Sequence, residues 1–232
     1  MEEQIIKYTI DIDSRDKLID SSAFHILPLN HEYIIKSLNP YEIKILFGRK
    51  QERTLIYSDK SKQYYLLNPY INRDFRNVCY LKILNVIFPR YYNVVKKNIN
   101  GKDELIKCDI YNQRFINVVI DINENTNIYS TTDKLNNCIK LKQLYSHNDN
   151  EKFIVLYPIH TENIYNFKNG QLKNIDRMEI KFYDDEYNQI ILDFNHLIDH
   201  KEKIKDYIKD HSVNIQIEVG CYEINMKNTN DY

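Results

Sequence analysis

The sequence predicts an all-β fold, a single jelly-roll β-sandwich with long loops and one short helix before the last strand. Its apolar runs are short, rich in Ile, Val, Tyr and Phe, and separated by Asn, Asp, Gly or Pro, a pattern typical of strands and turns. Two runs alternate apolar and polar residues, as strands with one buried face do. Roughly ten such strands bury their apolar sides when two sheets pack face to face, which favours a jelly roll.

The predicted strands share this composition. They span Ile5–Ile12, Tyr41–Phe47, Thr54–Tyr57, Val78–Phe88, Tyr91–Lys97, Phe115–Ile122, Phe153–Tyr157, Met178–Tyr183, Gln189–Phe194 and Val213–Ile224. Alternation is clearest in the strands that begin at Met178 and Val213. The run Leu81–Phe88 is apolar at almost every position, so we expect a central strand covered on both faces and ended by Pro89.

One segment has helical periodicity. Within Asp199–His211, the residues Ile204, Tyr207 and Ile208 follow i, i+3, i+4 spacing among charged residues. This spacing predicts a short amphipathic helix before the last strand, with Asp199 as a candidate N-cap.

The remaining segments indicate the domain organisation. The Asn-rich stretch Asn123–Asn150 predicts a long loop or a small subdomain between two halves of the sheet. A chain of this length can bury roughly 70% of its unfolded surface, so we predict one domain over residues 1–232. Short polar arms are expected at Met1–Gln4 and Lys227–Tyr232, because both lie outside the outermost predicted strands.

Charge and cysteine usage argue against several classes of protein. The 32 basic and 33 acidic residues leave a net charge of -1, which provides no general attraction for nucleic acid, so we expect no direct nucleic-acid binding. No stretch approaches the ~20 apolar residues of a transmembrane helix, so no transmembrane segment is expected. The four cysteines, Cys79, Cys108, Cys138 and Cys221, are far apart without a C-x-x-C pair and are interpreted as reduced thiols.

Patterns typical of catalysis are weak. His196 and His200 would share one helix face, but a metal site needs a third ligand, and HLIDH lacks the Glu of H-E-x-x-H. The four glycines form neither a G-x-S-x-G elbow nor a phosphate-binding loop. A turn between two strands explains Asp184 and Asp185 better than catalytic or calcium-binding carboxylates do. We therefore expect no catalytic, cofactor-binding or metal-binding residues, no cofactor and no enzyme activity.

Basic residues stand beside aromatic ones at Arg73–Arg76 and Arg90–Tyr92. Such clusters can stack on single-stranded nucleic acid. The balanced charge instead favours solvated strand ends that meet a neighbouring subunit. Tyr64–Tyr65 and Tyr91–Tyr92 are the candidate aromatic platforms for binding carbohydrate or peptide.

Three passages, taken in order, resemble one protein family. Ile10–Asp16 is similar to an I-D-S-R-D opening, Phe75–Val94 resembles an N-V-x-x-I-x-L segment followed by I-P and Y-x-I, and Phe153–Phe194 resembles a strand-turn-strand with L-D-R and D-x-x-G. The family is the single jelly-roll minor capsid and penton-type proteins of nucleocytoplasmic large DNA viruses. Ile175 stands in place of the usual Leu. Asn188 stands in place of the usual Gly, which Asn can replace because it tolerates positive φ.

The resemblance implies a structural protein of an icosahedral viral capsid, either a penton at the vertices or a minor capsid protein that braces the lattice. It implies contacts with other capsid proteins, including the major capsid protein, and a homo-oligomer that is a pentamer if the chain is a penton. The expected location is the virion, with the host cytoplasm during assembly. The residues leave open an alternative, a non-catalytic β-sandwich module that binds carbohydrate or peptide.

Overall fold

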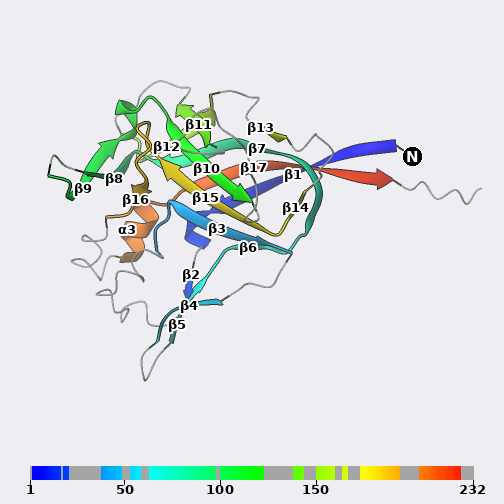
Figure 1. Cartoon of the computed structure of the whole chain (residues 1–232), viewed down its shortest axis with the longest axis horizontal. Coiled ribbons are helices and arrows are strands. Elements are labelled where there is room, and N and C mark those ends of the chain that lie inside the picture. The colour runs from blue at the N-terminus through cyan, green and yellow to red at the C-terminus, as the bar shows by residue number, and fades with distance from the viewer. Residues whose placement is uncertain are drawn as a thin grey trace, which may run out of the picture.

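The computed structural model describes residues 2–16, 18–20, 38–48, 53–58, 63–97, 100–122, 138–143, 150–159, 164–166, 173–193 and 204–225. Strands dominate these residues, and one short α-helix, α3 (Ile204–Asp210), lies among them. The fold is therefore all-β, as the sequence predicts (Figure 1). No described helix is long and apolar enough to cross a membrane.

The order of strands in the main sheet is that of a jelly roll. The sheet runs β1-β17-β7-β12-β11-β10-β15-β3-β6, and β6 (Tyr70–Ile71) is a two-residue strand at one end. The other strands of this path are β1 (Glu2–Asp13), β3 (Glu42–Phe47), β7 (Phe75–Pro89), β10 (Ile116–Ile122), β11 (Cys138–Gln143), β12 (Phe153–Pro158), β15 (Arg177–Tyr183) and β17 (Asn214–Asn225). Numbered along the chain, they follow the order 1-8-3-6-5-4-7-2. Strands 1-8-3-6 form one face of the sandwich and 5-4-7-2 the other, each neighbouring pair being antiparallel.

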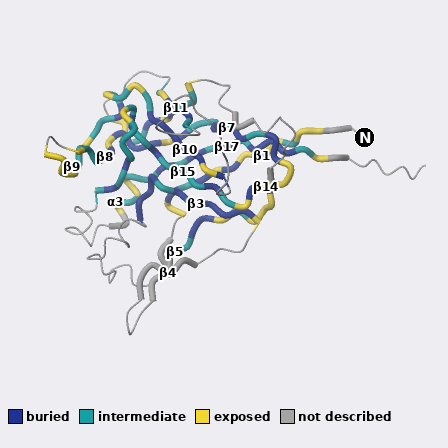
Figure 2. Tube along the Cα trace, in the orientation of Figure 1, coloured by how far each residue is buried: buried dark blue, intermediate teal, exposed yellow. Residues whose placement is uncertain are grey.

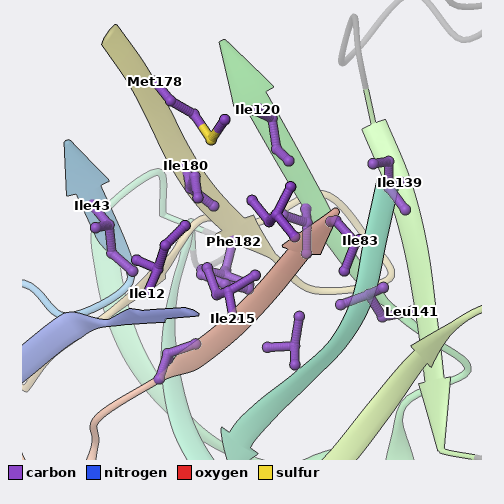
Figure 3. Close-up of a cluster of buried hydrophobic side chains, with 14 of the residues drawn as sticks. Ile12, Ile43, Ile83, Ile120, Ile139, Leu141, Met178, Ile180, Phe182 and Ile215 are labelled. Atoms are coloured by element: carbon purple, nitrogen blue, oxygen red, sulfur yellow. The ribbon is translucent and has the colours of Figure 1, made fainter. Parts of the chain in front are cut away.

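The sheet curls so that its two halves share one core (Figure 3). Ile215 and Ile83 point inward from one half, and Ile180 and Phe182 from the other. In β15 every second side chain is buried, as its alternating sequence predicts. Phe88 stands at the centre of an aromatic cluster, with ring centroids 5.2 Å from Phe182, 5.5 Å from Tyr41 and 5.8 Å from Tyr92. Figure 2 shows the buried chain concentrated where the two halves meet.

Smaller elements extend this framework. One three-stranded sheet consists of β16 (Ile190–Ile191), β8 (Tyr91–Lys97) and β9 (Asp103–Asp109), and another of β2 (Leu18–Asp20), β5 (Gln63–Leu67) and β4 (Arg53–Ser58). The short strands β13 (Ile164–Asn166) and β14 (Lys173–Ile175) pair with β7. Two 3-10 turns, η1 (Ser14–Asp16) and η3 (Ile110–Asn112), follow β1 and β9.

Several predicted boundaries are wrong. The predicted loop Asn123–Asn150 contains β11, because Ile139 and Leu141 alternate inward even among polar neighbours. Of the predicted strand Gln189–Phe194, Gln189 bridges to Tyr183 of β15, and Ile190–Ile191 form β16, which pairs with β8. Phe194 lies outside the described residues. Residues Glu2–Gln4, predicted as part of a polar arm, belong to β1.

Other differences concern coverage and helix length. β7 is central as predicted, but Ile87 is 38% exposed, so its outer face is not fully covered. The helix occupies Ile204–Asp210 within the predicted range, while the proposed cap Asp199 lies outside the described residues. The predicted arm Lys227–Tyr232 also lies outside them.

Gly220 permits β17 to pass close to a tyrosine ring on β7. An added Cβ at Gly220 would lie 2.2 Å from Cε1 of Tyr80. The hydroxyl of Tyr80 donates to Glu218 Oε1 at 2.8 Å, which holds the ring in place. The register of the two strands shifts at this point, between Gly220 and Cys221. A residue without a side chain is therefore required where β17 passes the ring.

We expect Gly220→Ala to lower the free energy of unfolding by about 2 kcal/mol, because overpacking a filled site forces the backbone or ring to move. Urea denaturation measures the loss. In a Tyr80→Ala background the same substitution has space and is expected to cost much less. An equal cost in both backgrounds would show that the ring is not the cause.

Candidate functional site

Residues of the I-D-S-R-D passage join the end of β1 to the start of β17. Ser14 donates its backbone N–H to the Val213 carbonyl at 2.9 Å, and its Oγ accepts the Val213 N–H at 2.8 Å. Both residues are buried. Beside them, Asp13 Oδ1 accepts the Arg15 N–H at 2.8 Å and forms an ion pair with the Arg15 side chain. Burial opposes ionisation of Asp13, but hydrogen bonds from Arg15 and its charge outweigh burial and lower the carboxyl pKa.

The acidic residues after β15 form a turn, as predicted. Asp184 is buried, and its Oδ1 accepts the backbone N–H groups of Glu186 at 3.0 Å and Asn188 at 2.7 Å. Asp185 pairs with Arg114 at 3.2 Å, and Glu186 is engaged by the Lys96 ammonium. These contacts account for the carboxylates without a catalytic or calcium-binding role.

One detail of this turn was predicted wrongly. The residue with positive φ is Tyr187, at 68°, and Asn188 is not among the residues with positive φ. The Asn188 amide instead donates its Nδ2 to Asp184 Oδ2 at 2.8 Å. Asn is therefore suited to this position by its hydrogen-bonding side chain. The strain of the turn falls on the residue before it.

The first basic and aromatic cluster is used within the fold. The Arg73 guanidinium lies 3.8 Å from the centroid of the Tyr8 ring, and Phe75 is buried against Phe47, with centroids 5.3 Å apart. Arg76 pairs with Asp74 at 3.4 Å on the surface. This arrangement leaves no exposed aromatic ring within Arg73–Arg76 on which a base could stack.

The second cluster borders a cleft of about 610 Å³ between β8, β9 and α3. Tyr91 is exposed at the cleft, whereas Tyr92 is fully buried in the core, so the two tyrosines do not form one platform. The side chains of Tyr64 and Tyr65 lie outside what the structure describes. The lining includes Arg90, Tyr91, Asn93, Lys107, Lys152, Asp193, Tyr207, Asp210 and His211.

Charges around the cleft are largely matched to one another. Arg90 donates Nε and Nη2 to Asp109 Oδ2 at 3.1 and 3.0 Å, and its guanidinium lies 4.9 Å from the Tyr91 ring centroid and 4.7 Å from that of Tyr111. Lys152 pairs with Asp210 at 3.0 Å. The guanidinium therefore ties the end of β7 to β9 and its following turn.

The opposite wall of the cleft comes from α3. The rings of Tyr207 and His211 pack at a tilt of 45°, with centroids 4.3 Å apart. Burial raises the pKa of Tyr207 to about 12, even though hydrogen bonds from the Asp193 backbone and the Asn93 side chain oppose the rise. A phenol with this pKa stays protonated at neutral pH and is a poor general base.

Cysteine chemistry is also suppressed. All four cysteines are free. Burial raises the pKa of both Cys138 and Cys221 to about 11. The Cys138 thiol donates to Asn117 Oδ1 at 3.0 Å, and Cys79 donates to the Gly220 carbonyl at 3.2 Å. Thiols with raised pKa values carry little thiolate and make weak nucleophiles at neutral pH.

Metal-ligand side chains are dispersed. Within the ranges that the structure describes, no three His, Cys, Asp or Glu side chains come together to hold a metal ion. His196 and His200 lie outside those ranges.

Sequence reasoning missed part of the cleft. Asp109 and Lys107 come from β9, a strand that was not predicted because DELIKCD has too few apolar residues to stand out. His211 was included only as the end of the predicted helix. Its ring joins the cleft because α3 packs beside β8 and β9. The long apolar strands could be found from their composition. That these polar residues line a cleft could be known only from the folded structure.

We expect Ser14→Ala to lower the free energy of unfolding by about 1–2 kcal/mol, because it leaves the buried Val213 N–H without its acceptor. Equilibrium unfolding in urea measures the change. The control is Ser212→Ala, which removes an exposed hydroxyl bonded to the Lys209 carbonyl at 2.8 Å and is expected to cost less. Equal losses in the two variants would contradict the role assigned to Ser14.

At pH 8, Cys138 and Cys221 are expected to react with iodoacetamide at least about a hundredfold more slowly than a small-molecule thiol, because a pKa near 11 reduces the thiolate fraction by that factor. The rates should increase as pH rises toward 11. Mass spectrometry of labelled peptides separates the sites, and urea-unfolded protein provides the fast control. Rapid labelling of either site in the folded chain would contradict the assigned burial.

Two comparisons with known proteins were negative. No protein-family model matches the chain, and no curated protein matches it. The basis for a functional proposal is therefore the chain's own residues and fold.

Proposed function

We propose that this chain is a structural protein of an icosahedral viral capsid, either a minor capsid protein or a penton component. It would assemble by protein contacts with copies of itself and with other capsid proteins, including the major capsid protein, and reside in the virion after assembly in the host cytoplasm. The observation that carries the proposal is the strand order 1-8-3-6-5-4-7-2. This is the jelly-roll order, which viral capsid proteins use widely.

The sequence resemblance supports the same role. The three resembling passages fall on the framework of the jelly roll: the end of β1, the central β7 and the segment from β12 to β16. Residues of these passages make contacts that hold the fold together. Examples are the hydrogen bonds of Ser14 to Val213 and the turn closed by Asp184. A structural protein needs such residues to hold strands in register, and none of them requires a ligand.

The shape also supports assembly through surfaces. The β1 and β17 ribbon projects from one end of the sandwich, and the β8 and β9 hairpin from the other (Figure 1). Edges of this kind can extend between neighbouring subunits. Tyr70 and Tyr91, exposed by 46% and 44%, provide aromatic side chains at the surface.

The cleft favours one alternative, a non-catalytic module that binds peptide or carbohydrate. Its volume of about 610 Å³ lies within the range of small-molecule sites. However, two cations approach the exposed Tyr91 ring, with Arg90 at 4.9 Å and Lys107 Nζ at 4.8 Å from its centroid. These cations compete with a sugar for the ring. The capsid role is therefore preferred.

Mass spectrometry of purified particles of the encoding virus tests the proposal. We expect the chain in intact particles, at a lower copy number than the major capsid protein. Infected-cell lysate is the control for expression. A chain that is abundant in the lysate and absent from purified particles would exclude the capsid role.

A further inference from the structure

The strand β1 forms one end of the main sheet. Among the strands that the structure describes, it pairs with β17 alone, so its other edge carries no neighbouring strand. The pairing of β17 with β7 ends at Cys221, and the last residues of β17 pair with β1. At this end the two strands form a ribbon that projects from the body of the sandwich (Figure 1). A ribbon of two strands is marginally stable in water, so a further strand would stabilise it.

The register identifies the backbone groups at the open edge of β1. Ser14 donates its backbone N–H to the Val213 carbonyl, so its peptide groups face β17. The register between the two strands does not shift along β1. Because successive residues of a strand direct their hydrogen bonds to opposite sides, the even-numbered residues of β1 bond to β17. The N–H and C=O groups of Glu3, Ile5 and Lys7 therefore face the open edge.

These three residues also share one face of the ribbon, since side chains alternate along a strand. Ile5 is 39% exposed, and it pairs with the half-buried Tyr222 of β17. The side chain of Lys7 is 65% exposed, and its Nζ lies 3.9 Å from Glu218 Oε1. Along the edge of β1, this face carries an acid at Glu3, an exposed apolar side chain at Ile5 and a base at Lys7.

The order of acid, apolar residue and base matches itself in an antiparallel pair. Edge strands commonly carry charges that prevent pairing with another chain. When Ile5 of one copy lies opposite Ile5 of another, however, Glu3 of each copy lies opposite Lys7 of the other. A register centred on Glu3 or on Lys7 would place like charges opposite each other, which is destabilising.

One other register also pairs opposite charges. If the pair were centred on Thr9, Lys7 would lie opposite Asp11 of the second copy. The same register places Ile5 opposite Asp13, so the exposed apolar side chain would meet an acid. The register centred on Ile5 satisfies the charged residues and the apolar residue together.

We propose that the open edge of β1 pairs with the same edge of a second copy, antiparallel and about a two-fold axis at Ile5. The facing residues Ile5 and Ile5, and Glu3 and Lys7, would each exchange a pair of backbone hydrogen bonds. The two ribbons would join in the order β17-β1-β1-β17, with Tyr222 and Ile5 of both copies in one apolar row. Main-chain bonds provide affinity in such strand addition. The two charge pairs select a second copy as the occupant, because the edge matches itself under the rotation.

This pairing goes beyond the proposed capsid role, because it names the partner and the register of one projecting edge. It does not require that the chain be part of a capsid. Self-association in solution and presence in virus particles are separate measurements, so failure of one proposal is distinguishable from failure of the other.

Charge exchange tests the register. Sedimentation equilibrium of the full chain measures the dissociation constant of the pair for the native protein, Glu3→Lys and Lys7→Glu. Each variant alone places like charges opposite each other at both flanks of Ile5, and we expect it to weaken pairing about tenfold or more. An equimolar mixture of the two variants restores attraction at both flanks. We therefore expect the mixture to pair 1:1 with near-native affinity.

A proline substitution tests the backbone contacts. Ile5→Pro removes an N–H that faces the open edge and leaves the bonds between β1 and β17 in place, so we expect the variant to fold and to lose pairing. Ile5→Val keeps the N–H and a β-branched apolar side chain and is expected to pair with near-native affinity. Circular dichroism and urea unfolding check that each variant folds.

Two further controls separate the edge from general charge effects. Lys142→Glu makes the same charge change as Lys7→Glu at an exposed position of β11. Asp11→Lys changes an exposed residue of β1 beyond the paired segment. Both variants are expected to leave pairing unchanged.

Weak pairing in Glu3→Lys and in Lys7→Glu, restored in their mixture, supports the arrangement centred on Ile5. A native chain that stays monomeric at every concentration would overturn it, as would association that Ile5→Pro does not affect. Loss of pairing in Asp11→Lys but not in Glu3→Lys would also overturn it, in favour of the register centred on Thr9.

Discussion

The insertion of β17 between β1 and β7 joins the strands of the first half of the sandwich. It brings residues 2–13, 75–89 and 214–225 side by side, although they are far apart along the chain. Without this strand the first half of the sandwich would separate into β1 and β7 with no shared edge. Ser14 and Val213 set where the pairing begins, and Gly220 allows it to continue past Tyr80. Such long-range pairing costs loop entropy and makes the fold slow to form.

β17 and β12 use the same face of the sheet in opposite ways. The outward residues Gln216 and Glu218 of β17 are polar and meet Asn85 and Tyr80 of β7. The outward residues of β12 are apolar, including the exposed Val155. A polar outer row is stable against water by itself, whereas an apolar row gains free energy when it is covered. The difference between these two strands distinguishes the solvated part of the face from the part available for contacts.

Charged and titratable groups act mainly as structural links. The carboxylate of Asp184 closes a turn, and that of Asp109 holds Arg90 between two tyrosine rings. Burial raises the pKa values of Cys138, Cys221 and Tyr207, which favours their neutral forms. These observations fit a protein that works through shape and contact surfaces, and they agree with the role proposed for it.

The all-β fold could be predicted from sequence because strand alternation is local. In Met178–Tyr183 the polarity of each residue predicts which face of the sheet its side chain occupies, and the structure confirms that pattern. The strands β9 and β11 were missed for the opposite reason, since few apolar residues mark them. The Asp184 turn was predicted from its residue types, but the position of its positive φ was not.

The fold class, the core strands and the absence of familiar catalytic motifs could be read from local patterns, because each of these depends on residues close together in the chain. The strand order and the cleft depend instead on contacts between distant segments. Tyr91 and Tyr92 are adjacent in sequence, yet one lies at the cleft and the other in the core. Ser14 and Val213 are distant in sequence, yet they hydrogen-bond to each other. Strand pairing brings distant residues together, and no local sequence pattern predicts which strands will pair.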